Sequence, residues 1–160
     1  WERSYPYFEG VIVAALGPQM LELAGRRTDG TILWLVGPNT VRDHIGPTIT
    51  AAAEAAGRPA PRVIASVPVC VTDDGEGVRN TVAMILANYN DLPSYRALLD
   101  GEGAAGPADV AIIGNEDEVT EGLAAFAAAG ATEFAAVEFT LNDEDAARTR
   151  ALLKSVRTSF

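Results

Sequence analysis

Side chains that build metal sites and disulfides are scarce in this 160-residue chain, which has one cysteine and one histidine. Cys70 lies inside an apolar run, so we interpret it as a small buried residue, and a single thiol excludes a disulfide framework and a zinc cluster. His44 lies in a helical segment without neighbouring ligand types, and we interpret it as a surface or packing residue. The sequence therefore predicts no metal site, and a reducing, cytoplasmic location is the default expectation.

Positive charge is also scarce. Twelve basic residues stand against 22 acidic ones, which gives a formal net charge of −10. Because the basic residues are scattered, the chain repels a phosphate backbone, and we expect no nucleic-acid partner. No signal peptide and no apolar run near the ~20 residues of a membrane span is present, so we expect no membrane partner. With 48% hydrophobic residues, the chain is typical of a globular unit with a core.

Strand and helix patterns alternate along the chain. Apolar, β-branched runs predict four strands, at Val11–Ala15, Thr31–Val36, Arg62–Val71 and Phe134–Phe139. Helical patterns follow them, at Pro18–Ala24, Thr40–Ala56, Gly75–Asn90, Ser94–Leu99, 115–130 and Asp143–Val156. Asn115 with Glu118 is typical of a capping box. We expect a kink at Pro47.

Strands separated by helices favour parallel pairing through right-handed crossovers, an α/β fold. No linker or repeat divides the chain, so we treat residues 1–160 as one unit. A doubly wound sheet is disfavoured because the chain has no G-x-G-x-x-G fingerprint. Four strands are half of the eight that a (β/α)8 barrel needs, and we predict half a barrel.

The first strand runs directly into a helix through Gly17 and Pro18. Proline suits the first helical position, and glycine lets the backbone approach a ligand. The free amides and the dipole of a first helical turn favour an anion, so this junction is a candidate phosphate cradle. Considered alone, the pattern fits a purely structural tight turn equally well.

Several blocks of the sequence together resemble a known family. They are Ala14-Ala15-Leu16-Gly17-Pro18-Gln19-Met20-Leu21, Ala24-Gly25, Asp29-Gly30-Thr31-Ile32-Leu33-Trp34, Ala53-Glu54-Ala55-Ala56-Gly57-Arg58, the strand end Pro68–Asp74, and Ile113–Val119 before Ala129-Gly130-Ala131. In order and spacing they are similar to luciferase-like monooxygenases and their coenzyme F420-dependent relatives. The resemblance spans about residues 11 to 156 and implies that family's TIM barrel. This chain then corresponds to the C-terminal half, strands five to eight with their helices.

The resemblance also implies a cofactor site. In such enzymes the segment after the fifth strand holds the flavin or deazaflavin phosphate. It corresponds here to Ala14, Ala15, Leu16, Gly17, Pro18, Gln19 and Met20. The end of the sixth strand makes Trp34, Leu35 and Val36 pocket candidates, although barrel packing is the simpler explanation for Leu35 and Val36. A large aromatic residue at a strand's C-terminal end, such as Trp34, commonly lines a ligand pocket.

The chain departs from the family pattern in two ways. Relatives that clamp a sugar phosphate carry a lysine soon after the sixth strand, whereas Gly37-Pro38-Asn39-Thr40 has no positive charge. The proton-handling residues of the family belong to strands one to four, so the catalytic residues of this protein are unknown. Glu138, the carboxylate near the last strand's end, is more simply a solvated charge. The first residue, Trp1, is not methionine, which indicates a fragment of something longer.

We therefore predict an oxidoreductase of the luciferase-like class, in which F420, or alternatively FMN, passes a hydride to an organic substrate or to oxygen. This chain would supply the half that binds the cofactor phosphate. The alternative is a half-barrel without catalysis that binds a ligand or serves assembly. We expect a small-molecule substrate, and either a homo-oligomer or association with the missing half-barrel.

Overall fold

The structure is a computed structural model and describes residues 10–156. Its strands are β1 (Ile12–Ala14), β2 (Gly30–Ile32), β3 (Arg62–Ala65), β4 (Pro68–Val71), β5 (Ile112–Gly114), β6 (Glu133–Phe134) and β7 (Val137–Glu138). Its α-helices are α1 (Pro18–Arg27), α2 (Pro38–Thr40), α3 (Gly46–Ala55), α4 (Gly75–Ile85), α5 (Pro93–Glu102), α6 (Glu116–Ala128) and α7 (Asp143–Val156). A π-helical turn, η1 (Val41–Ile45), joins α2 to α3, and 3-10 turns η2 (Ala87–Asp91) and η3 (Pro107–Val110) flank α5.

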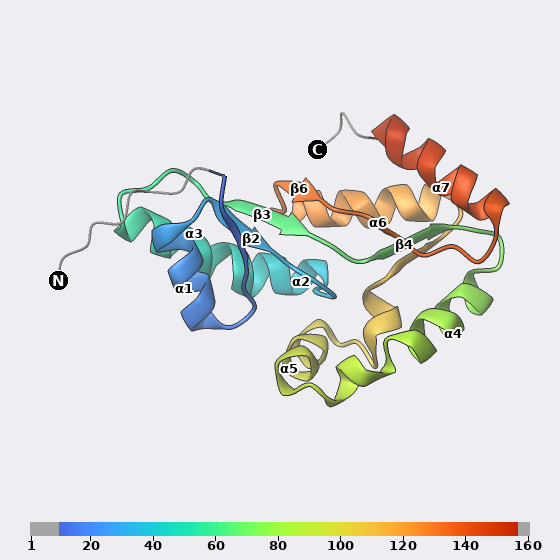
Figure 1. The fold of residues 1–160 in the computed structure, drawn as a ribbon, viewed down its shortest axis with the longest axis horizontal. Coiled ribbons are helices and arrows are strands. Elements are labelled where there is room, and N and C mark those ends of the chain that lie inside the picture. Colours follow the sequence, from blue (N-terminus) through green and yellow to red (C-terminus); the bar gives the residue numbers. More distant parts are fainter. Residues whose placement is uncertain (1–9, 157–160) are drawn as a thin grey trace.

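All strand pairs are parallel, as the alternation of strands and helices predicts. One sheet has the order β1-β2-β3-β6 and the other β5-β4-β7. The two sheets are continuous through the chain, because β3 leads into β4 and β6 into β7. Figure 1 shows α1 and α3 beside the first sheet, α6 and α7 above the second, and α4 and α5 below it.

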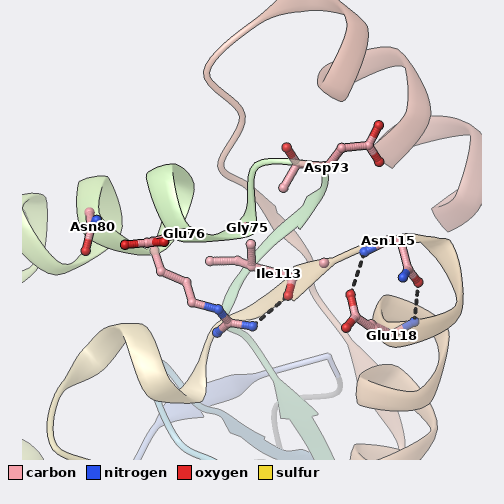
Figure 2. Close-up of a pocket in the computed structure, with 10 residues that line it drawn as sticks. Asp73, Gly75, Glu76, Asn80, Ile113, Asn115 and Glu118 are labelled. Atoms are coloured by element: carbon pink, nitrogen blue, oxygen red, sulfur yellow. Dashed lines mark hydrogen bonds between the residues drawn. The ribbon is translucent and has the colours of Figure 1, made fainter.

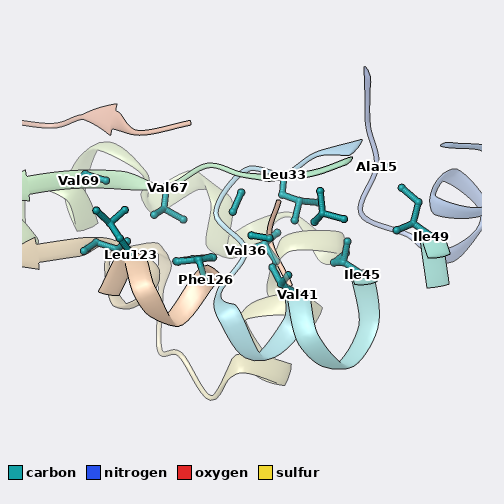
Figure 3. Packing of buried hydrophobic residues seen from close by; sticks show 14 of the residues in the cluster. Ala15, Leu33, Val36, Val41, Ile45, Ile49, Val67, Val69, Leu123 and Phe126 are labelled. Carbon is teal, nitrogen blue, oxygen red and sulfur yellow. The ribbon is translucent and has the colours of Figure 1, made fainter. Parts of the chain in front are cut away.

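The main hydrophobic core lies between the strands and the helices α1, α3 and α6. Val63 and Ala65 of β3, and Leu33 just after β2, lie on this side with at most 3% of their surface exposed. They share one hydrophobic cluster with Leu21 of α1. Figure 3 shows further helix residues of the cluster, namely Ile45, Ile49, Leu123 and Phe126. Burial of these side chains is the main favourable term for the fold.

The opposite face of the first sheet is open. Ala14 is exposed and Ile32 is 38% exposed, and the two residues are partners in the register of β1 and β2. Within residues 10–156, β1 and β6 each pair on one side only. One helix-covered face, one open face and two outer strands are the geometry of half a (β/α)8 barrel.

The strands are shorter than the sequence predicts. The run Arg62–Val71 is interrupted at Ser66 and Val67, where the Ser66 hydroxyl donates a hydrogen bond to the carbonyl oxygen of Ala135 at 2.8 Å. The second strand ends at Ile32, and Leu35 has φ +53°, a left-handed conformation that an extended strand cannot contain. The last strand is also split, into β6 and β7.

Two further elements differ from the prediction. The sequence pattern does not predict β5, because three residues are too few to show a period. The expected kink near Pro47 takes the form of the π-helical turn η1, in which the amide of Gly46 donates to the carbonyl of Val41, five residues earlier. A wider turn just before proline avoids the clash that Pro47 would cause within a regular helix.

Candidate cofactor site

The turn between β1 and α1 presents free backbone donors to solvent. Gly17 is the N-cap of α1 with φ −83° and ψ 158°, Pro18 is the first helical residue, and no side chain caps the helix. The first described intrahelical bond runs from the amide of Leu21 to the carbonyl of Gly17 at 3.0 Å. Gln19 and Met20 are exposed, and their amides have no acceptor among residues 10–156. Such a helix start favours an anion.

The residues just before Gly17 contact the side chains of Thr31 and His44. The Ala15 amide donates to Thr31 Oγ1 at 3.2 Å, and the Thr31 hydroxyl lies 3.3 Å from the carbonyl oxygen of Ala15. His44 Nε2 lies 3.3 Å from the carbonyl oxygen of Leu16. The amide of Ala15 is thus already engaged, whereas those of Leu16 and Gly17 make no hydrogen bond within the described part of the chain. Half-buried His44 packs against the turn.

An apolar pocket of about 370 Å3 lies at the C-terminal ends of β1 and β2, next to this turn. Its lining combines predicted site residues with others, namely Ala14, Leu16, Ile32, Leu33, Trp34, Ser66 and Tyr95. The structure thus brings Ala14, Leu16 and Trp34 together around one cavity. Leu35, in contrast, is 1% exposed and contacts the hydrophobic cluster around Cys70, and Val36 is equally buried in the main core.

Ser66 and Tyr95 line this pocket although sequence reasoning did not single them out. Ser66 is a buried polar residue inside an apolar strand run, which is a recognisable signal. Tyr95 lies on α5, more than 60 positions after Trp34, and only the tertiary fold brings the two together. Burial raises the pKa of Tyr95, and nearby Tyr89 raises it further, so its phenol stays a neutral hydrogen-bonding group.

A second, polar pocket of about 530 Å3 lies at the C-terminal ends of β4 and β5 (Figure 2). Both helices that begin there are already capped, since Asp74 accepts from the Gly77 amide at 2.9 Å and Asn115 from the Glu118 amide at 3.0 Å. Glu118 in turn accepts from the Asn115 amide at 2.8 Å, which completes the predicted capping box.

The charges around this polar pocket disfavour an anionic cofactor. Three carboxylates, Asp73, Glu76 and Glu118, line it together with a single cation, Arg79. That guanidinium donates to the carbonyl oxygen of Ile113 at 2.6 Å. A phosphate would meet filled caps and net negative charge here, whereas the turn at Gly17 offers open donors.

Three carboxylates near the C-terminal ends of the strands form ion pairs with arginines of α7. Arg148 bridges Glu116 at 2.9 Å and Asp73 at 3.1 Å, and its hydrogen bonds lower the pKa of Glu116. Glu138 pairs with Arg150 at 2.6 Å. Among residues 10–156, no group of three or more potential ligands lies together. Burial, reinforced by the charge of Asp145, raises the pKa of the Cys70 thiol to about 11.

No helix in the described part of the chain is both long and apolar enough to cross a bilayer.

Several solved structures share this architecture. An F420-dependent secondary alcohol dehydrogenase, in complex with an F420-acetone adduct, superposes with a TM-score of 0.64 at 14% identity, over 93% of this chain and 47% of that one. The EDTA monooxygenase of a Chelativorans species gives 0.66 at 18% identity, over 97% and 46%. The FMN-bound oxygenating constituent of 3,6-diketocamphane monooxygenase from Pseudomonas putida gives 0.59 at 19%, over 89% and 46%. The chain thus spans about half the length of these proteins.

No curated protein matches the sequence. The sequence profile of the luciferase-like monooxygenases, however, matches residues 4–133, which is most of the chain. Together with the half-barrel architecture, this match shows the family: the chain belongs to the luciferase-like monooxygenases.

Proposed function

We propose that this chain is the cofactor-phosphate-binding half of an F420- or FMN-dependent oxidoreductase that transfers a hydride to an organic substrate or to oxygen. The observation that carries the proposal is the open turn at Gly17, which adjoins the apolar pocket lined by Trp34. A phosphate needs donors and a flavin-like ring needs an apolar cleft. The chain offers both next to each other at one end of its strands.

The donors would hold the phosphate without a basic residue. The amides of Leu16, Gly17, Gln19 and Met20 are free within the described part of the chain, and the α1 dipole adds partial positive charge. Pro18 fixes the first helical residue, so the amides of the next two need no rearrangement to bind. A Cβ atom added at Gly17 would meet nothing within 4 Å, so the turn is accessible.

The pocket residues would hold the rest of the molecule. Trp34 and Tyr95 offer aromatic surface for a planar ring, and Ala14, Leu16 and Ile32 exclude water from it. When bound, a flavin or deazaflavin supplies the hydride chemistry. The chain's own residues bind and orient it.

Ligands with and without phosphate test the proposal. FMN and riboflavin share a ring, and only FMN carries the phosphate. F420 and its phosphate-free chromophore form a second such pair. We expect difference spectra to show tighter binding of the phosphate-bearing member of at least one pair. Equal affinities within both pairs would rule out the phosphate site.

The second candidate function is a ligand-binding or assembly module without catalysis. The pocket lining includes no carboxylate and no imidazole, and its polar groups are the hydroxyls of Ser66 and Tyr95 and the indole N–H of Trp34. Holding a ligand therefore needs no residue beyond those described, whereas proton transfer at its ring would need groups from elsewhere. Binding without turnover, in the presence of the complementary half-barrel, would favour this candidate.

A complementary half-barrel is the partner that we propose for the open side. The outer strands β1 and β6 and the exposed face at Ile32 leave apolar surface and unpaired backbone groups. Sedimentation of the isolated chain should show concentration-dependent self-association, and co-expression with strands one to four of a relative should suppress it. A stable monomer that oxidises the cofactor with substrate would contradict the half-barrel assignment.

A further inference from the structure

The carboxylate of Glu102, at the end of α5, binds the turn that follows β2. It accepts hydrogen bonds from the amide of Asn39 at 3.1 Å, from the amide of Thr40 at 2.9 Å and from the Thr40 hydroxyl at 2.9 Å. These contacts join residues 62 and 63 positions apart in the sequence. Hydrogen bonds to an ionised acceptor are stronger than neutral ones, so this is a firm attachment of α5 to α2.

The segment that Glu102 attaches carries Tyr95 and is internally rigid. Tyr95 packs edge-to-face against Tyr89 of η2 with ring centroids 4.8 Å apart. Arg96 donates to Asn90 at 3.2 Å, to the carbonyl oxygen of Ala104 at 2.8 Å and to that of Ala105 at 3.1 Å. These bonds stay within residues 90–105 and hold η2 and α5 together. Buried Leu99 packs α5 into the cluster around Leu35 and Cys70, and the Glu102 carboxylate adds a polar attachment to α2.

Tyr95 and Trp34 form two walls of the same 370 Å3 pocket, and both contact the cluster around Leu35 and Cys70. They come from different parts of the fold, because Trp34 follows β2 whereas Tyr95 belongs to α5. The contact of Glu102 with Asn39 and Thr40 holds α5 against α2, the helix that follows Trp34 in the sequence. The width of the pocket between the two aromatic residues therefore depends on this contact together with the packing of Leu99.

We propose that Tyr95 is a specificity-determining wall of the pocket and that Glu102 is the positioning residue that holds it opposite Trp34. The proposal rests on the proposed function in that the pocket is taken as the place of the cofactor ring or substrate. The occupant is a flat, apolar organic group bounded by the two aromatic side chains. Loss of Glu102 lets α5 move away and widens the pocket, while the phosphate cradle at Gly17 is left intact.

Tryptophan fluorescence tests the positioning role without any ligand. The sequence has two tryptophans, so Trp1→Phe leaves Trp34 as the single emitter. In that background we expect Glu102→Ala to raise the acrylamide quenching constant of Trp34 by about twofold, because local opening exposes the indole. Glu102→Gln keeps one acceptor oxygen and gives an intermediate value. Asp91→Ala, which removes an exposed carboxylate of η2 that makes no side-chain hydrogen bond within the described part of the chain, is the matched control.

A second variant keeps the test decisive if Glu102→Ala unfolds. Thr40→Val removes one of the three hydrogen bonds and leaves the carboxylate in place, and we expect a smaller rise in quenching in the same direction. Tyr95→Ala removes the wall itself and raises quenching even with Glu102 present. Unchanged quenching in Glu102→Ala, with the melting transition still cooperative, overturns the positioning role.

Ligand binding separates this inference from the proposed function. In each of the variants Tyr95→Ala and Glu102→Ala, the affinity for FMN and the affinity for riboflavin should fall by the same factor. Both variants change the pocket wall that contacts the ring, which the two ligands share. Gly17→Asp should weaken FMN alone. If quenching responds to Glu102 but neither ligand binds any variant or the parent, the proposed function fails while the attachment of α5 stands. If both ligands bind equally well to the parent and to Tyr95→Ala, the specificity role is wrong.

Discussion

Two turns of this molecule have nearly the same backbone and opposite surroundings. Gly17 caps α1 with φ −83° and ψ 158°, and Gly37 caps α2 with φ −83° and ψ 169°; each is followed by proline. Neither helix start has a capping side chain from its own N-cap residue. The turn at Gly37 is filled by the Glu102 carboxylate, whereas the turn at Gly17 is open in the described part of the chain.

The turn at Gly37 indicates what kind of group the open turn at Gly17 is able to bind. The carboxylate of Glu102 is held by two backbone amides and one hydroxyl, and no cation takes part in these hydrogen bonds. In this fold a Gly-Pro helix start, together with the Thr40 hydroxyl and the nearby charge of Arg42, thus holds an anionic group. An anion at Gly17 must come from outside the described residues, and a cofactor phosphate has the right charge.

The largest expected effect comes from placing a carboxylate in the open turn. Gly17→Asp puts into the first turn what Glu102 puts into the second, so the new side chain competes with the phosphate and repels it. We expect FMN or F420 affinity to fall by about 30-fold, which corresponds to ~2 kcal/mol. Because aspartate is a good N-cap, the melting temperature should be unchanged or slightly higher. Spectral titration and calorimetry measure the two quantities.

Gly17→Ala is the matched control for this prediction. An added Cβ meets nothing within 4 Å at this position and brings no charge. Affinity close to that of the parent is expected. A similar loss in the alanine and aspartate variants would indicate a steric rather than an electrostatic effect.

The second prediction concerns the turn at Gly37 and the loss of the carboxylate that binds there. A Cβ added at Gly37 would lie 2.3 Å from Cδ of Glu102, so Gly37→Ala expels the carboxylate and breaks its three hydrogen bonds. We expect a loss of stability of about 1.5 kcal/mol in denaturant unfolding. In a Glu102→Ala background the same substitution should cost much less, because the clash is gone. Additive costs in the double variant would contradict the clash.

Local sequence signals predict much of the fold. Proline at the first helical position marks the start of α1, and Asn115 with Glu118 marks the start of α6, as the structure confirms. Alternation of apolar runs with helical periods predicts the parallel half-barrel. These features depend on residues that are close in sequence, so a single chain is enough to read them.

The parts that escaped prediction depend on distant residues. The two turns share the Gly-Pro pair, and the residues near Gly37 do not indicate that Glu102, more than 60 positions later, binds there. Tyr95 joins Trp34 at the pocket for the same reason. The left-handed Leu35 is likewise set by its environment, because its amide donates to the carbonyl oxygen of Ser66 at 3.1 Å while its side chain is buried.

The third prediction concerns the pocket beside the open turn. Trp34→Phe keeps an aromatic ring but loses surface against the ligand, so we expect FMN and riboflavin affinities to fall together by about fivefold. Stability should change by no more than about 1 kcal/mol, because the side chain is only half-buried. A change in melting temperature with unaltered affinity for both ligands would assign Trp34 to packing.

The smallest expected effect on stability comes from Glu133, a carboxylate that is paired with a surface cation, whereas Glu102 is bound by backbone amides. Glu133 pairs with Arg62 where both side chains are nearly half exposed, at 44% and 46%. The hydrogen bonds from Arg62 lower the pKa of Glu133 below its ordinary value. Its contribution to stability is therefore complete above the pKa of the unfolded chain, near 4.5, and is lost as the pH falls through the lower folded value.

Because the pair is exposed and screened by salt, Glu133→Gln should cost only a few tenths of a kcal/mol at pH 7 and nothing measurable once the pH is low enough to protonate Glu133 in the folded protein. Glu102→Gln should cost more at pH 7, since one amide oxygen replaces a carboxylate that serves three donors. Urea unfolding of both variants at 0.1 and 1 M salt measures the difference, and only the Glu133 effect should shrink with salt. Equal costs that fall together with salt would mean that Glu102 is held no more firmly than a surface ion pair, and that the filled turn is no guide to the open one.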